Sequence, residues 1–215
     1  MEITWRDKKI TCEEGTTLFD ISKQVEKEYE FPIIVAKVDG VIQELYHEVI
    51  DGTTVSFCTT KDSDGKRAYI RGMSMLLLKA IQEEKAFKEE DRITIDFCLD
   101  SGYYCHLNSK EKPTKELLNR LEKRMREDVK KDIRFEKVVM RTRDARRMFE
   151  KKHMSDKSNL LKYRRNSRMT VYHLGDFTDY YYGAMPYSTG ILTHFRLELF
   201  EDGFVFVGAD YSQIE

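Results

Sequence analysis

Two Asp-Gly dipeptides, Asp39-Gly40 and Asp51-Gly52, constrain the fold of the first 60 residues more than any other feature. This dipeptide is the strongest short-range signal for a tight turn between two strands. The apolar run 33–38 comes directly before the first of them, and the run 53–58, rich in β-branched residues, follows the second. Both runs are therefore predicted to be strands joined through tight turns.

The residues before these strands add a hairpin and one helix. Residues 2–5 and 9–12 are short strand candidates joined by a tight turn. In 18–25 the apolar residues recur at helical spacing, and Thr17 with Asp20 forms a near capping box in which Asp replaces the usual Glu. Two strands, a helix and two further strands within about 60 residues are the order of elements in a β-grasp domain.

After residue 60 the pattern changes to longer helices mixed with strands. The polar, Gly-containing stretch 61–66 is predicted to be a linker, so we expect one domain over 1–60 and a second over 67–215. The chain is thus predicted to be an α+β protein. The elements expected in the second domain are helices at 67–82, 113–131 and 142–154 and strands at 93–99, 103–107, 135–140, 171–174, 191–200 and 204–207.

Composition argues against membrane, secreted and metal-binding classes. Charged residues make up 35% of the chain, and no apolar run reaches the length of a membrane span. The N-terminus lacks the basic-then-apolar pattern of a secretion signal, so a cytoplasmic location is expected. The four cysteines are expected to be free thiols, because a cytosolic chain of this size needs no disulfide and their spacing matches no zinc site. We therefore expect no metal and no cofactor in this chain.

The net charge of −1 conceals a strong asymmetry. Residues 110–168 contain 22 Lys and Arg against 10 Asp and Glu, a net charge of +12, and the rest of the chain carries −13. Such a segment either meets the phosphates of a nucleic acid or forms long, solvated helices of mixed charge, and the sequence leaves both alternatives open. The residues predicted to contact RNA are Lys123, Arg124, Arg143, Arg146 and Arg147.

Short sequence motifs resemble parts of two modules of threonyl-tRNA synthetases. The first 60 residues resemble a TGS domain, and residues 67–208 resemble the second additional domain of threonyl- and alanyl-tRNA synthetases. The resemblance covers nearly the whole chain and implies tRNA as a partner. In those enzymes the second domain hydrolyses mischarged tRNA. The words that carry the resemblance are 14–21, 35–40 and 51–55 for the first module and 121–125, 176–179, Gly183 and 188–190 for the second.

The residues that would carry this hydrolysis are replaced. The resemblance implies a His-x-x-x-His pair on the first helix of the second domain and a Cys-x-x-x-His pair after the word 176–179. Arg71 and Met75 stand at the positions of the first pair, and Tyr181 and Met185 at those of the second. An arginine cannot give up its proton, a thioether is a soft ligand, and tyrosine is a poor base near neutral pH. Editing hydrolysis is therefore not expected, and no catalytic residue is assigned.

The scaffold that the sequence resembles brings these replaced positions together in a degenerate pocket. A guanidinium in a partly buried site needs an acidic or phosphate partner, and Asp176 and Asp179 are the candidates to pair with Arg71. Tyr103 is expected at a turn that faces the pocket, where with Tyr181 it either fills the space or offers a flat face to a base. A closed pocket implies a structural element, and an open one implies a nucleotide or another anionic ligand.

The words 179–183 and 188–197 also resemble the N-terminal region of bacterial uridine kinase-like proteins, which carry both synthetase-like modules ahead of a kinase domain. This chain has no Gly-x-x-x-x-Gly-Lys-Ser/Thr loop, so any ATP-dependent uridine or nucleoside kinase activity is attributed to an attached domain. The main hypothesis is a non-catalytic regulatory or ligand- or RNA-binding region of such a protein. The alternative is a tRNA-binding or editing fragment of a threonyl-tRNA synthetase-like protein.

Overall fold

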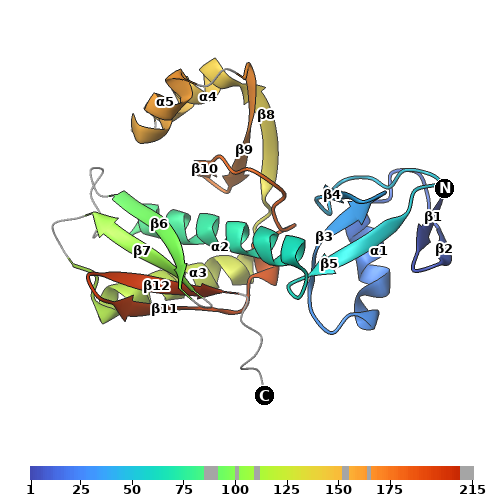
Figure 1. Ribbon diagram of the computed structural model, residues 1–215, viewed down its shortest axis with the longest axis horizontal. Helices are drawn as coiled ribbons and strands as arrows, with labels where there is room; N and C mark the ends of the chain where they lie inside the picture. The colour runs from blue at the N-terminus through green and yellow to red at the C-terminus, as the bar shows by residue number, and fades with distance from the viewer. Residues whose placement is uncertain (85–91, 100–101, 109–111, 152–154, 164–165, 209–215) are drawn as a thin grey trace.

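The computed structural model in Figure 1 describes residues 1–84, 92–99, 102–108, 112–151, 155–163 and 166–208. The side chains of residues 92, 96–99, 155 and 156 are outside this description. Helices and strands are mixed along the chain, which confirms the predicted α+β class. A long helix starts beside the N-terminal elements and runs between the two sheets of the remaining chain (Figure 1).

The N-terminal unit, which we define as residues 1–59, packs one helix against short strands. β3 lies between β4 and β5 in one sheet, β1 pairs with β2 in a hairpin, and a parallel bridge between Thr4 and Thr54 connects the hairpin to the sheet edge. The β-grasp and TGS assignments stay predictions. The elements are β1 (Glu2–Trp5), β2 (Lys8–Thr11), α1 (Leu18–Val25), η1 (Glu26–Glu28), β3 (Ile33–Val38), β4 (Val41–Gln43) and β5 (Val55–Thr59).

The start of α1 confirms the capping box expected from the sequence. The Thr17 hydroxyl accepts from the Asp20 amide at 3.2 Å, and the Asp20 carboxylate accepts from the Thr17 amide at 2.9 Å. These two bonds satisfy amide groups that the first helical turn leaves without partners. The helix then buries Leu18, Ile21 and Val25 in the core of the N-terminal unit.

Residues 63–66 of the predicted linker are helical, because the structure continues almost directly from β5 into α2 (Ser63–Glu83). The Asp62 carboxylate accepts from the amide of Thr59 at 2.7 Å and from its hydroxyl at 3.0 Å, which closes a tight turn before the helix. Gly65 then lies so close to the Thr59 carbonyl that only a hydrogen fits there. The polar residues that suggested a flexible linker are therefore a turn and the first turn of a helix, and the domain boundary stays a prediction.

α2 is buried on several faces rather than along one stripe. Its apolar residues, such as Tyr69, Met73, Leu76 and Leu77, are fully buried in the largest core cluster. The helix contacts β3 and β5 of the N-terminal unit, and also α3, β9 and β12. Within the described residues, no helix has the length and apolar content needed to cross a membrane.

The main sheet, which we define as strands β11-β12-β7-β6 in that order, is antiparallel. α2 and α3 pack against it, and α3 also contacts β11 (Figure 1). The Thr114 hydroxyl caps α3 by accepting from the Leu117 amide at 3.2 Å. The elements are β6 (Arg92–Leu99), β7 (Gly102–Asn108), α3 (Lys115–Lys131), η2 (Thr189–Ile191), β11 (Phe195–Phe200) and β12 (Gly203–Gly208).

The small sheet, which we define as β10-β9-β8, lies on the other side of α2 and carries α4 and α5 on its outer end (Figure 1). Its own core contains Phe149, Leu161, Met169 and Val171. The helix predicted over 142–154 corresponds to α4, with residues 152–154 outside the description, and α5 follows it in the structure. The elements are β8 (Glu136–Arg141), α4 (Thr142–Lys151), α5 (Ser155–Lys162), β9 (Arg168–Leu174) and β10 (Phe177–Asp179).

The close approach at Gly65 gives the first prediction. In a Gly65→Ala variant the new Cβ would lie 2.0 Å from the Thr59 carbonyl oxygen, which is backbone and must shift. We expect a loss of about 1–3 kcal/mol in unfolding free energy, even though alanine favours a helix, because overpacking outweighs that gain. Urea unfolding measures the effect, with the exposed neighbour Lys66→Ala as the control. A Gly65→Ala variant as stable as the parent would mean that α2 begins later than Ser63.

Candidate functional site

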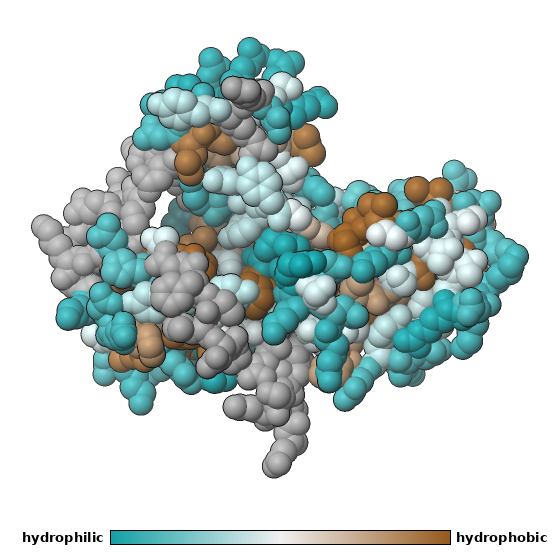
Figure 2. All heavy atoms as spheres, viewed as in Figure 1, coloured by the Kyte–Doolittle hydropathy of each residue, from teal (hydrophilic) through white to brown (hydrophobic). Residues whose placement is uncertain are grey.

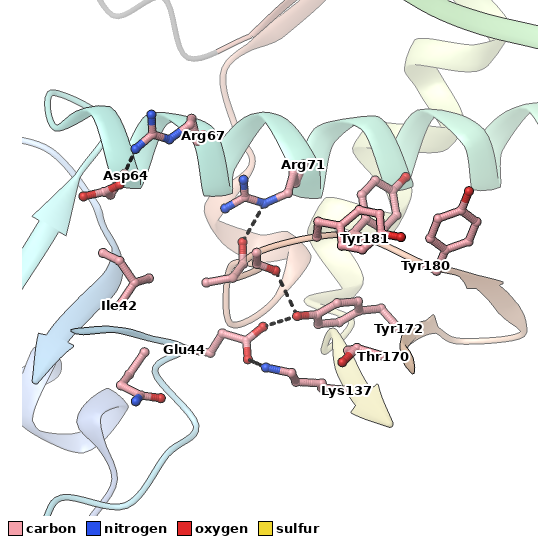
Figure 3. A pocket seen from close by; sticks show the side chains of 14 residues that line it. Ile42, Glu44, Asp64, Arg67, Arg71, Lys137, Thr170, Tyr172, Tyr180 and Tyr181 are labelled. Carbon is pink, nitrogen blue, oxygen red and sulfur yellow. Dashed lines mark hydrogen bonds and ion pairs between the residues drawn. The ribbon is translucent and has the colours of Figure 1, made fainter. Parts of the chain in front are cut away.

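A cleft of about 460 Å³ lies where the N-terminal unit, α2 and the small sheet meet. In Figure 3, Arg67 and Arg71 extend from α2, while Glu44 approaches from the N-terminal unit and meets Tyr172 and Lys137 of the small sheet. We call this space the Arg71 cleft. Its lining consists of Ile42, Gln43, Glu44, Asp64, Arg67, Arg71, Lys137, Thr170, Tyr172, Tyr180, Tyr181, Tyr182, Gly183 and Ala184.

The centre of the lining is the buried carboxylate of Glu44, which is only 2% exposed. One oxygen accepts from the Tyr172 hydroxyl at 2.6 Å and from the Met185 amide at 3.0 Å. The other accepts from the Lys137 ammonium at 2.8 Å and from the Tyr46 hydroxyl at 3.0 Å. A side chain of the N-terminal unit is thus held by the small sheet and by the segment that follows it.

These donors keep Glu44 charged despite its burial. Burial by itself raises the pKa of Glu44, but the bonds from Lys137, Tyr172 and the Met185 amide hold the pKa below its ordinary value of 4.5. Burial and the nearby negative charge of Glu44 raise the pKa of Tyr172 and of Tyr46. Both phenols therefore remain protonated donors, and the carboxylate is a satisfied structural acceptor.

Arg71 reaches the cleft from the middle of α2. Its Nε donates to the Ala184 carbonyl at 2.9 Å, and no described residue forms an ion pair with it. Its guanidinium lies against the backbone of Gly183, where φ is +103° and an added Cβ would lie 2.9 Å from Arg71 Cζ. Glycine is required there both for the backbone conformation and for the close approach. Burial lowers the pKa of Arg71, yet an arginine stays charged at neutral pH.

The expected pairing of Arg71 with Asp176 or Asp179 is wrong. Asp179 is 4% exposed and forms an ion pair with Lys157 of α5 at 2.5 Å, and it also accepts from the Tyr180 amide at 2.7 Å. Asp176 is exposed in the turn between β9 and β10. Asp179 belongs to the packing between β10 and α5, so Arg71 binds a backbone carbonyl instead of a carboxylate.

The other positions of the predicted degenerate pocket divide into three groups. Met75 and Met185 are 0% and 1% exposed and belong to the same core cluster, beneath the cleft rather than on its surface. Tyr181 lines the cleft together with Arg71. Tyr103 does not line it, because its ring stacks on Phe206 in the main sheet at a centroid distance of 5.9 Å.

A second cleft, of about 540 Å³, lies where β8 ends, α4 begins and β9 begins. Its cations are Arg141, Arg143, Arg146, Lys162 and Arg168, and we call it the basic cleft. Arg141 and Arg168 are directly opposite each other across β8 and β9, a like-charge pair that costs stability, and neither forms an ion pair with a described residue. Figure 2 shows the hydrophilic surface over α4 and α5 beside it. The arrangement concentrates positive charge where an anion would relieve the repulsion.

The residues predicted to contact RNA do not form one surface. Arg143 and Arg146 line the basic cleft, and the exposed Arg147 lies on the same helix outside its lining. Lys123 and Arg124 lie on α3, which lines neither cleft. Arg124 also forms an ion pair with the buried Glu84 at 3.2 Å, so Glu84 partly neutralises its charge.

No metal centre is found in the described part of the chain. There, no three His, Cys, Asp or Glu side chains converge as metal ligands. Cys12, Cys58 and Cys105 are free thiols, whereas the Cys98 side chain lies outside the described residues. Burial raises the pKa of Cys58, which makes it a poor nucleophile or ligand.

Comparison with known proteins finds similarity to threonine–tRNA ligases. It is similar to the threonine–tRNA ligase of Clostridium kluyveri, with 29% identity over 184 residues that cover 85% of this chain and 28% of the ligase. The ligases of Caldanaerobacter subterraneus and Thermus thermophilus each match with 26% identity over 199 residues, covering 92% and 88% of this chain and 30% of each ligase. No family model matches.

The chain is thus similar to a region of threonine–tRNA ligases, and it spans less than a third of the length of these curated relatives. The similarity extends over most of the chain, so it includes the elements that form both clefts. None of these three relatives is a kinase, and the expected link to uridine kinase-like proteins has no support among them.

Three residues that organise the Arg71 cleft were not predicted: Glu44, Lys137 and Tyr172. Glu44 lies between Gln43 and Leu45 in the sequence, and no spacing marks it as the acceptor of a network. Its partners Lys137 and Tyr172 lie 93 and 128 residues away. Only the fold brings such distant groups together, so no local signal could have found them.

The Glu44 network gives the second prediction. A Glu44→Gln variant loses the charged acceptor of Lys137, so we expect a loss of about 3 kcal/mol at neutral pH. Because folding lowers the pKa of Glu44, its contribution is present above pH 4.5 and is lost as the pH falls through the folded-state pKa. The stability difference between parent and variant should therefore shrink on acidification. Urea unfolding from pH 7 to pH 3 measures it, and the exposed Glu48→Gln variant is the control.

Tyr181 gives the third prediction. Its hydroxyl is buried, and no described residue hydrogen-bonds to it. Removing the oxygen in a Tyr181→Phe variant eliminates an unsatisfied buried group, so the free energy of unfolding should rise by about 1 kcal/mol. Thermal unfolding measures the change, with the exposed Tyr163→Phe as the control. A clear loss of stability would show that the hydroxyl has a partner in the folded protein.

Proposed function

We propose that this chain is an RNA-binding region on a threonyl-tRNA synthetase-like scaffold, which contacts tRNA phosphates and does not hydrolyse mischarged tRNA. The observation that carries the proposal is the basic cleft, in which five cations meet and two of them stand directly opposite each other without a carboxylate partner among the described residues. The similarity to threonine–tRNA ligases supplies the class of RNA.

The composition of the Arg71 cleft supports the absence of hydrolysis. A hydrolytic site needs a group that activates water, and the four aligned positions offer none in the described structure. Arg71 is bound to a carbonyl, Met75 and Met185 are sealed in the core, and the Tyr181 hydroxyl is buried with a pKa raised well above its ordinary value by that burial. Glu44 is charged but already accepts four hydrogen bonds.

The chemistry of the basic cleft supports phosphate binding. Arginine presents a planar fork of donors that matches two phosphate oxygens, and such contacts release counterions and dominate the affinity for nucleic acids. The cleft also contains Asn166 and Ser167, whose polar groups commonly contact phosphate and sugar.

The larger context of the chain remains a hypothesis. Attachment to a nucleoside kinase domain rests on the sequence resemblance alone, and the relatives named above favour the synthetase-like alternative. In either context the proposed role is RNA binding without a cofactor, in the cytoplasm.

Neutralising the basic cleft gives the fourth prediction. The variant Arg141→Gln, Arg143→Gln, Arg168→Gln should weaken tRNA binding by at least about tenfold at low salt, because it removes three phosphate contacts. The slope of log affinity against log salt should fall by about 2 for the same reason. Filter binding or fluorescence anisotropy at several salt concentrations measures both quantities.

A matched control keeps this experiment specific. The variant Lys8→Gln, Lys23→Gln, Lys27→Gln removes the same charge from exposed sites of the N-terminal unit and should bind tRNA like the parent. Equal losses in both triple variants would reduce the effect to net charge. Unchanged binding in the basic-cleft variant, or no binding by the parent, would contradict the proposal.

A further inference from the structure

β8 gives the small sheet an open edge. The strand order β10-β9-β8 leaves β8 paired on one side only, and its six residues exceed the three residues of the edge strands β4 and β10. At the β11 edge of the main sheet, side chains of α3 occupy the backbone. Glu122 accepts from the Leu197 amide at 2.5 Å, and Arg126 donates to the Phe195 carbonyl at 2.9 Å. Among the described residues, nothing occupies the outer edge of β8 over 137–141 in this way.

The backbone of β8 presents alternate residues to this open edge. In an antiparallel ladder the N–H and C=O groups of every second residue point to the same side. The Thr142 amide donates to the Ser167 carbonyl at 2.9 Å, on the side of β9. The Phe135 amide donates to the Tyr187 carbonyl at 3.2 Å, on the opposite side. The residues of β8 whose backbone groups face outward are therefore the odd-numbered ones, Lys137, Val139 and Arg141.

The chain itself adds an extended segment to the start of this edge. Residues 187–189 pair with 133–135 in antiparallel fashion. Before them in the chain, the Met185 amide donates to Glu44 instead, so this segment does not reach the backbone of Lys137. The open part of the edge therefore begins where an internal strand ends, which is a geometry that can accept a second extended segment.

The side chains on this edge select the chemistry of an added strand. Val139 is 56% exposed in the middle of β8, so an apolar neighbour would bury it. Arg141 is exposed and forms no ion pair with a described residue, whereas Lys137 already pairs with Glu44. Residues two positions apart share one face of a strand, so an apolar residue opposite Val139 places another residue of its own strand opposite Arg141. A carboxylate at that second position would neutralise the arginine.

We propose that the outer edge of β8 binds an extended, acidic segment of a partner protein as an added strand. Backbone hydrogen bonds supply the affinity, and the apolar and acidic side chains supply the specificity. An acidic segment fits because Arg141 stands directly opposite Arg168, and a carboxylate beside them relieves that repulsion. This site goes beyond the proposed RNA contact, since it recognises a protein backbone and shares only Arg141 with the basic cleft.

The test uses the full chain and the fluorescein-labelled peptide Thr-Glu-Thr-Val-Thr-Glu-Thr as the probe. This sequence reads the same in both directions, so a parallel or an antiparallel strand places its valine opposite Val139 and a glutamate opposite Arg141. Fluorescence anisotropy should show saturable binding at submillimolar peptide concentration. A peptide with lysine in place of both glutamates should bind at least about tenfold more weakly, because like charges would then face each other.

Amide hydrogen exchange locates the bound peptide without any substitution. The Val139 amide faces outward, so it should exchange fast in the protein alone and at least about tenfold more slowly when the peptide binds. The Val138 amide faces β9 and is the internal control, which should be protected in both states.

The variant Val139→Pro separates strand addition from the attraction of charges. Proline lacks the outward amide but leaves the bonds to β9 in place, so the sheet should still form. Peptide binding should weaken at least about tenfold, because one backbone donor is lost and the ring blocks the edge. Val139→Thr keeps the amide and is the matched control, which should bind within about threefold of the parent. If Val139→Pro does not fold, the exchange of the Val139 amide in the parent decides.

Binding of tRNA keeps this proposal apart from the RNA contact. Val139→Pro retains every cation of the basic cleft, so its affinity for tRNA should equal that of the parent. Absence of peptide binding at millimolar concentration, equal binding by Val139→Pro, or equal binding of the lysine peptide would overturn the inference. Protection of the Val139 amide by tRNA and not by the peptide would assign the edge to RNA and overturn it as well.

Discussion

The buried carboxylate of Glu44 joins the N-terminal unit to the small sheet and to the segment after it, beside the apolar packing of β3 and β5 on α2. A charge in such a place is tolerated only when hydrogen bonds replace its hydration, and here four donors do so. Three of those donors belong to the small sheet and the segment after it. Their hydrogen bonds satisfy the Glu44 carboxylate and also fix the relative position of the elements around the Arg71 cleft. Removing one group of this network would leave its buried partners without a hydrogen bond, so the contributions of the groups to stability depend on one another.

The sequence predicted the fold class and many of its elements because those depend on local signals. The capping box at Thr17, the turn at Asp39-Gly40 and the helical spacing of α3 all correspond to observed features. Residues 63–66 were predicted as part of a linker although they are helical, because polar residues also begin helices, and only the burial of Gly65 against Thr59 distinguishes the two cases.

The candidate site was harder to predict, for a physical reason. Arg71 and Tyr181 were found because their positions align with a known pattern, and the structure places both at one cleft. The predicted pairing of Arg71 with an aspartate was wrong, because Asp179 forms an ion pair with Lys157 of α5. No local sequence pattern specifies where α5 packs. Glu44 was missed because its partners are distant in the chain, so its role exists only after folding.

Under the proposed function, the Arg71 cleft and the basic cleft separate the positions aligned with hydrolysis from those that contact RNA. Methionines at positions 75 and 185 extend the apolar core to the place where polar ligands were expected, which stabilises the scaffold and removes the means of activating water. The basic cleft is separate from this change, since it is built from β8, α4, β9 and the end of α5. The proposed RNA contact therefore uses other residues than the positions aligned with the hydrolytic site.

The most direct measurement of this account is to incubate the protein with tRNA that carries a mischarged serine and to follow binding and deacylation in the same sample. The account predicts saturable binding that weakens with salt, together with deacylation no faster than in buffer. Hydrolysis above that background, which disappears when the protein is removed, would contradict the central claim that the scaffold binds RNA without editing it.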